Sequence, residues 1–323
     1  MHVNLTDHDA NETSFQYFYL LPFSGETRSK PFITAFFFLI YVVGVLINSS
    51  IITVICLEVQ LHKPMYLFIC NLSIVDIFYT SVMVPKLLHM LLSGNHIVSS
   101  AQCYTQLYSF VAVASAEDSL LFVMAYDRYV AICNPLHYTQ ILSPGKSTML
   151  TIGIWAAGFF NSLTFVSSIV YMSSCHSNII HQLFCDIKSL TQITCTTTEM
   201  FIVVNFVELL IFAGIPLMGT FVSYVIIFSV IFKMKTNENR KKAFSTCTSH
   251  VIVITVYYGT SVIGYLIPAY IEALDTVFNI IYITVIPMIN PVIYSLKNSS
   301  VQSALLGLLR RMSFGKSDAR HAH

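Results

Sequence analysis

The sequence predicts an all-α membrane protein, a bundle of seven transmembrane helices. Hydrophobic residues make up 55% of the 323 residues and charged residues only 10%, and the mean hydropathy is +0.69. A soluble domain carries about 25% charged residues. So few charged side chains cannot form the polar surface of a soluble protein of this length. The net charge of +1 gives no sign of a nucleic-acid partner.

Apolar stretches long enough to cross about 30 Å of hydrocarbon recur along the chain. We expect seven spans, at Phe32 to Cys56, Met65 to Met90, Leu107 to Cys133, Met149 to Val170, Phe201 to Phe232, Phe244 to Ile267 and Val277 to Leu296. The predicted domains are an extracellular N-terminal segment (1–31), the transmembrane bundle (32–297) and a cytoplasmic amphipathic helix with a tail (298–323).

Charge placement predicts the orientation, because Lys and Arg accumulate on cytoplasmic loops. With the N-terminus outside and the C-terminus inside, only four of these residues fall outside, namely Arg28, Lys30, Lys86 and Lys188. Asn4 and Asn11 begin glycosylation sequons, which agrees with an outside N-terminus. The first thirty residues lack the pattern of a cleaved signal peptide, so we expect the first span to direct insertion.

The cysteines divide into two groups of four by position. Those in or near the inner ends of spans suit apolar packing: Cys56, Cys70, Cys133 and Cys247. The outer group is expected to form disulfides in an oxidising compartment: Cys103, Cys175, Cys185 and Cys195. Four cysteines allow three pairings, which spacing alone does not separate.

Carboxylates inside the spans are candidates for function, because burying an ionisable group in a membrane is costly. They are Asp76, Glu117, Asp118 and Glu208. Asn48 and Asn290 are available to Asp76 as polar partners. If Asp76 and Glu117 approach each other, they should share a proton or hold a cation, because two adjacent carboxylates resist double ionisation. The alternative is a purely structural network of polar side chains that holds the helices together. Prolines at 216, 287 and 291 permit kinks, which also occur in rigid membrane proteins.

Helical spacing predicts a ligand pocket in the outer half of the bundle. Its residues recur at intervals of three and four on the third, fifth and sixth spans: Leu107, Phe110, Val111 and Ala114; Asn205, Glu208 and Phe212; Tyr258, Val262 and Tyr265. A mostly apolar lining with a few polar groups is typical of a small-molecule site. Ordinary helix packing is the alternative for each apolar residue. Glu208 is expected to accept a hydrogen bond or a cation from the ligand. The same residue disfavours a fatty acid, although Lys86, His181 or Lys188 could offer compensating charge from the rim of the pocket.

Five motifs appear in a family's order along the chain. They are "KPMYLF" (63–68), "MAYDRYVAIC" (124–133), "KAFSTCTSH" (242–250), "YYG" (257–259) and "PMINPVIYSLKN" (287–298). Together they resemble the olfactory receptors of the rhodopsin-like, class A G-protein-coupled receptors. The resemblance implies a receptor rather than an enzyme. It also implies an odorant ligand, a stimulatory olfactory heterotrimeric G protein that raises cyclic AMP, and the plasma membrane of sensory cilia.

The resemblance also implies roles for single residues at the inner end. Asp127 would restrain Arg128 in the resting state, with Tyr129 beside them, and Arg128 would reach the G protein once released. From position alone, Arg128 could equally be an interfacial anchor. The other activation residues implied are Tyr224, His250, Asn290, Pro291 and Tyr294.

Further expectations come from the same resemblance. Tyr258 would be an aromatic toggle below the ligand. The disulfides would be Cys103–Cys185 and Cys175–Cys195. A sodium ion would lie among Asp76, Glu117 and Asn290 as an allosteric ligand, and no other cofactor is expected. Residues after the seventh span would form an amphipathic helix whose Arg310 and Arg311 face lipid phosphates.

Other classes predict features that the sequence lacks. A transporter or channel would favour internal repeats, and none is visible. An intramembrane enzyme would need a catalytic constellation or metal-ligand spacing, which the scattered histidines do not supply. A non-olfactory class A chemoreceptor remains an alternative. The resemblance places Phe110 where receptors for biogenic amines carry an aspartate, which argues against that class of receptor.

Overall fold

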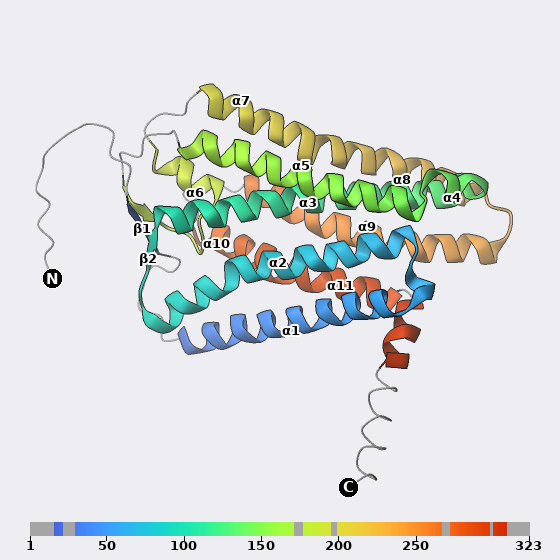
Figure 1. Cartoon of the computed structure of the whole chain (residues 1–323), viewed down its shortest axis with the longest axis horizontal. Helices are drawn as coiled ribbons and strands as arrows, with labels where there is room; N and C mark the ends of the chain where they lie inside the picture. Colours follow the sequence, from blue (N-terminus) through green and yellow to red (C-terminus); the bar gives the residue numbers. More distant parts are fainter. Residues whose placement is uncertain are drawn as a thin grey trace, which may run out of the picture.

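The computed structural model shows long helices that lie side by side along one axis, with short strands at one end (Figure 1). It describes residues 16–21, 30–170, 177–194, 199–266, 272–297 and 300–308. Among these residues, seven helices are long and apolar enough to cross a membrane, which confirms the predicted fold class. We call the end that carries the Cys103–Cys185 bond the disulfide end, and the opposite end the Arg128 end.

The spans follow one another along the chain with short connections. The first four are α1 (Lys30–Leu57), α2 (Pro64–Ser93), α3 (Ser100–Cys133) and α5 (Pro144–Val170), with 3₁₀ turns at Val59–Leu61 and Pro135–His137 and the short α4 (Tyr138–Ile141) between them. The fifth comprises α7 (Glu199–Glu208), a π-helical segment (Leu209–Gly214) and α8 (Ile215–Lys233). The sixth is α9 (Asn237–Leu266), and the seventh comprises α10 (Glu272–Ile280), a π-helical segment (Ile281–Val285) and α11 (Ile286–Lys297).

Every span begins earlier than hydropathy predicts, and the third and the sixth spans show the largest difference. The third span starts at Ser100 rather than Leu107, because Ser99 and Gln102 form a reciprocal capping box with two hydrogen bonds of 3.2 Å. The sixth starts at Asn237 rather than Phe244, with a polar first turn. Hydropathy detects only the part of a helix that crosses lipid, whereas the backbone hydrogen bonds continue into the polar flanks.

The π-helical segments in the fifth and seventh spans have a shared local cause. Each ends two residues before a proline, Pro216 or Pro287. Proline has no N–H to donate, and its ring clashes with the carbonyl of the preceding turn, so that turn widens. Both widened turns contribute residues to the cavity described below.

A small β-sheet covers part of the disulfide end, which the all-α prediction did not include. β1 (Tyr17–Leu20) lies between β2 (Ile97–Ser99), to which it is antiparallel, and β3 (Ile179–Ile180), to which it is parallel. Phe18 and Leu20 are 1% and 0% exposed, and their neighbours face outward. A strand this short gives too little periodicity to be recognised in the sequence.

The third span is the central helix of the bundle. α3 packs against α2, α5 and α8. Gly158 on α5 permits the close contact between α5 and α3, because a Cβ at this position would lie 2.7 Å from the carbonyl oxygen of Ala112 on α3. Apolar side chains such as Phe206 and Phe221, 64% and 62% exposed, cover the outside of the bundle, as lipid contact requires.

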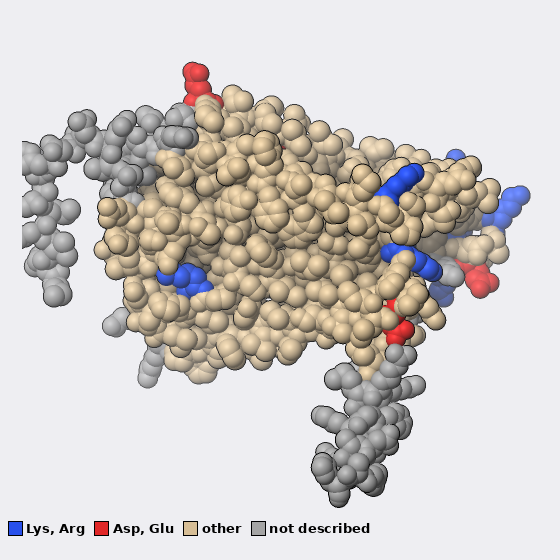
Figure 2. All heavy atoms as spheres, in the orientation of Figure 1, with Lys and Arg blue, Asp and Glu red and all other residues tan. Residues whose placement is uncertain are grey.

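Charged residues gather near the ends of the bundle. On the face shown in Figure 2, Lys and Arg are concentrated at the Arg128 end, and the middle of the molecule is nearly free of charge. This distribution agrees with a membrane-spanning bundle. Beyond α11, residues 300–308 are helical and Val301 is buried.

Some predicted features lie outside the described part of the chain. These are the sequons at Asn4 and Asn11, the Cys175–Cys195 bond, and Arg310 with Arg311. They stay predictions.

Candidate functional site

A cavity opens in the half of the bundle nearer the disulfide end. Its volume is about 160 Å³, and the described residues that line it come from α3, the fifth, sixth and seventh spans, and the segment that follows β3. Drug-sized ligands occupy pockets of roughly 300–1,000 Å³. This cavity therefore suits a smaller molecule.

The structure brings five of the ten predicted ligand residues into this cavity: Phe110, Val111, Ala114, Glu208 and Tyr258. Leu107 is completely buried in the core, and Val262 is 50% exposed. Leu107, Asn205, Phe212 and Val262 are not among the described residues of the lining. The side chain of Tyr265 lies outside the described part.

The sequence prediction left out lining residues that matter chemically. Asp118 continues the third-span spacing four residues beyond Ala114, so the same periodicity could have identified it. Tyr282 lies in the widened turn of the seventh span, and its position depends on the π-helical geometry. Phe184 and Asp186 belong to the loop after β3, which has no helical period to read.

Among the described residues, three carboxylates and one ammonium group line the cavity. Asp118 and Glu208 come from the membrane-spanning helices. Asp186 and Lys188 come from the segment after β3, where Asp186 caps the short helix α6 (Ile187–Gln192) that contains Lys188. The Asp118 carboxylate interacts electrostatically with that of Glu208 and lies close to the Tyr258 hydroxyl. Neither Asp118 Oδ1 nor Tyr258 Oη completes a hydrogen bond of normal geometry within the described chain.

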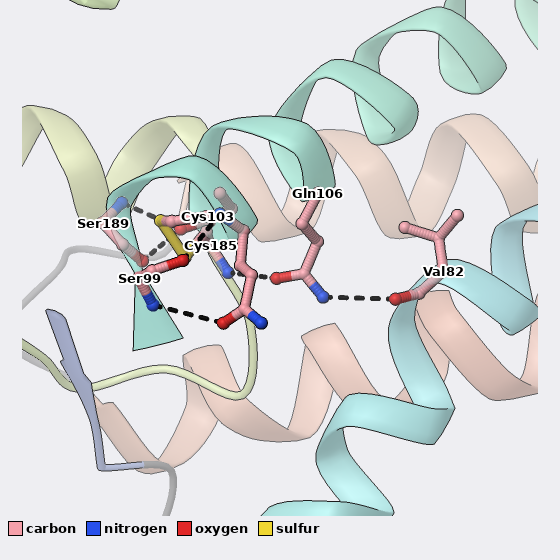
Figure 3. Close-up of a disulfide and its surroundings, with 8 residues drawn as sticks. Val82, Ser99, Cys103, Gln106, Cys185 and Ser189 are labelled. Carbon is pink, nitrogen blue, oxygen red and sulfur yellow. Dashed lines mark hydrogen bonds between the residues drawn. A yellow bond between two sulfur atoms is a disulfide. The ribbon is translucent and has the colours of Figure 1, made fainter. Parts of the chain in front are cut away.

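The disulfide fixes the loop that supplies Phe184 and Asp186 (Figure 3). Cys185 is bonded to Cys103 on α3, as the family resemblance implies. Gln106 accepts a hydrogen bond of 3.0 Å from the Cys185 backbone N–H and donates one of 3.3 Å to the carbonyl of Val82 on α2. One side chain thus joins two helices and the loop beside the cavity.

The Arg128 end contains a compact charged group. Arg128 donates from Nε and Nη2 to Asp127 Oδ2 at 3.0 and 2.5 Å, and Tyr138 on α4 donates to Asp127 Oδ1 at 2.6 Å. Asp127 is completely buried and the Arg128 side chain is 15% exposed. Burial, and then the negative charge of Asp127, raise the pKa of Tyr138 above its ordinary value, so its hydroxyl stays a donor.

A second polar contact joins the fifth and sixth spans near the same end. The Tyr224 hydroxyl lies 2.7 Å from His250 Nδ1. Tyr224 and Cys247 belong to a small apolar cluster with Ala125. Tyr129 packs against this cluster, and the side chain of Tyr294 lies outside the described part.

The proposed sodium residues do meet in the middle of the bundle. Asn290, which precedes the helix proline Pro291, donates to Asp76 at 3.1 Å and to Glu117 at 3.5 Å. Asn48 is not part of this group, because its amide bonds the carbonyls of Gly44 and Pro287. Oxygen ligands suit a hard cation, and Asp76 Oδ2 has no hydrogen-bond partner among the residues that the structure describes. No cluster of three or more His, Cys, Asp or Glu suited to a metal occurs in the described ranges, so sodium stays a prediction.

Comparison with known proteins gives consistent matches over most of the chain. The family described as "Olfactory receptor" matches residues 37–311. The chain is 39% identical to olfactory receptor 5B21 of Mus musculus over 303 residues, which cover 93% of this chain and 95% of that one. It is 40% identical to olfactory receptor 8H3 of Homo sapiens over 309 residues (93% and 97%). It is 37% identical to olfactory receptor 1A1 of Homo sapiens over 302 residues (93% and 97%).

Proposed function

The chain belongs to the olfactory receptor family of G-protein-coupled receptors, and on that premise we propose that it binds a small odorant in the cavity near the disulfide end and signals through the Arg128 end. The observation that carries this proposal is the course of α3. The helix contributes Phe110 and Asp118 to the cavity and carries the Asp127–Arg128 pair near its other end. A ligand that shifts α3 or its neighbours therefore acts on both regions.

The cavity faces the outside of the cell in this proposal. The positive-inside rule assigns the Lys- and Arg-rich Arg128 end to the cytoplasm. The disulfide agrees with this orientation, since such bonds persist in oxidising compartments. The plasma membrane of sensory cilia is the proposed location.

Activation would proceed by a shift between two arrangements. An odorant must bind the active arrangement more tightly than the resting one, because equal affinity for both would shift nothing. In the active arrangement, Arg128 leaves Asp127 and meets a stimulatory olfactory G protein, which then raises cyclic AMP. The Tyr224–His250 contact would separate or rearrange as the fifth and sixth spans move.

Cyclic AMP output from cells that express the full chain with this G protein tests the proposal. The odorant panel contains amines, acids, alcohols and ketones. We expect a concentration-dependent response that Arg128→Ala removes at equal surface expression. Lys146→Ala removes an exposed cation of the same end and serves as the matched control.

Two results would contradict the proposal. One is a response that Arg128→Ala leaves intact. The other is an odorant-gated ion current in cells without the G protein, which would favour a channel.

A further inference from the structure

We propose that the cavity selects a small protonated amine and that Asp118 and Glu208 are its charged acceptors. This inference rests on the proposed odorant-binding role of the cavity and adds the chemical class of the ligand. It assigns Asp118, which lies deeper on α3 than Phe110, to the binding site.

The first argument is the incomplete hydrogen bonding at the wall of the cavity. Tyr258 is only 8% exposed, yet its hydroxyl completes no hydrogen bond of normal geometry among the described residues. The same holds for Asp118 Oδ1, and both side chains line the cavity. These two groups are neighbours and interact with each other, but without a hydrogen bond of normal geometry. Buried polar atoms are nearly always paired, and a ligand with N–H donors would complete the pairing.

The second argument is the charge of the lining. Asp118 interacts electrostatically with Glu208 and also with Glu117 on the same helix. The single cation of the described lining, Lys188, lies on the loop side, where Asp186 also lies. Carboxylates that interact in a membrane interior repel if they are ionised, and a cation beside them relieves that repulsion.

The third argument is the aromatic surface around these carboxylates. Phe110, Tyr257, Tyr258 and Tyr282 all line the cavity. Phe110 and Tyr257 each contact the ring of Tyr282, at centroid distances of 6.3 and 6.1 Å. Aromatic faces attract an ammonium group, whereas an anionic odorant would meet both repulsion and the electron-rich rings. The volume of about 160 Å³ limits the amine to a small one.

Three odorants of matched shape test the inference: isoamylamine, isoamyl alcohol and isovaleric acid. Each is applied to cells that express the full chain with the olfactory G protein. We expect isoamylamine to be the most potent, and Asp118→Asn and Glu208→Gln each to weaken it roughly 30-fold, as loss of one partner of a buried charge pair does. Glu199→Gln changes an exposed carboxylate at the start of α7 and is the matched control.

A second measurement separates binding from signalling. The thermal stability of the purified chain in detergent is measured with each of the three compounds. If isoamylamine alone raises the melting temperature and Asp118→Asn removes this effect, the inference is supported. If the same amine produces no cyclic AMP, that result counts against the proposed G-protein coupling and not against the inference.

Two results would overturn the inference. One is a response to the alcohol or the acid without any to the amine, which would leave the odorant-receptor proposal standing. The other is that isoamylamine changes neither cyclic AMP nor the melting temperature, or that its effects remain the same in both Asp118→Asn and Glu208→Gln.

Discussion

Asp118 and Asp127 lie on the same helix, α3, but their surroundings differ completely. Asp127 uses both carboxylate oxygens, one for Arg128 and the other for Tyr138. Asp118 faces a cavity, and its Oδ1 has no hydrogen-bond partner within the described chain. The Arg128 end is thus internally satisfied, whereas the cavity leaves acceptors open.

This contrast indicates how the two regions can work together. In the proposed mechanism, the Asp127–Arg128 pair must break before Arg128 can meet the G protein, so the pair would hold the resting state. The open acceptor of Asp118 would be satisfied by a ligand, so the cavity would respond to ligand binding. Substitutions that act on one region and spare the other test this division.

Asp127→Asn is expected to have the largest effect. It removes the charge that holds Arg128, and hydrogen bonds to charged groups contribute about 1.5–3 kcal/mol. Basal cyclic AMP formation should therefore rise about 10-fold or more, while odorant potency at the cavity changes little. Glu238→Gln, an exposed carboxylate at the same end, is the control, and unchanged basal activity in Asp127→Asn would contradict the resting role.

Gln106→Leu should weaken the disulfide end alone. The substitution leaves the buried Cys185 N–H without its acceptor, at a cost of about 1–3 kcal/mol. We expect about a 10-fold loss of odorant potency with normal basal activity. Gln140→Leu at the opposite end is the control, and a rise in basal activity in Gln106→Leu would show that the two regions are not separable.

Gly158→Ala tests whether the α3–α5 contact forms a rigid wall beside both regions. The new Cβ would meet the Ala112 carbonyl at 2.7 Å, and backbone cannot move aside easily. Overpacking costs about 1–3 kcal/mol, so the melting temperature in detergent should fall. Gly153→Ala on the same helix is the control, because a Cβ at Gly153 would have no neighbouring atom within 4 Å. This substitution should leave the melting temperature unchanged or slightly higher.

Tyr138→Phe is expected to have the smallest effect. It removes one hydrogen bond from Asp127 but leaves the pair with Arg128, so basal activity should rise about 3-fold. Tyr126→Phe is the control.

The same variant gives a pH test. A tyrosine with a raised pKa stays protonated below its ordinary value of about 10 and loses its proton only as the pH rises through the higher value. Since Asp127 and Arg128 are the charges that face Tyr138, the ratio of basal activities should stay constant from about pH 6 to 9. A ratio that changes within that window would contradict the assignment.

Sequence reasoning succeeded where a signal is local. Apolar length identified every span, and Arg128 directly follows an apolar run at the end of one. It placed only part of the cavity, because the spacing rule assumes regular helices. Tyr282 and Leu209 enter the lining from π-helical segments, where the regular period breaks down.

The sequence by itself determined the seven-span bundle, its family and the charged triplet at the end of the third span, because hydropathy and short motifs depend only on neighbouring residues. The tertiary structure decided which carboxylates are paired. Asp76 and Glu117 both accept from the amide of Asn290, which lies far from them in the sequence. Asp118 instead lines the cavity. Those choices follow from the rotation and widening of whole helices against one another, and such packing is not encoded in any single stretch of the chain.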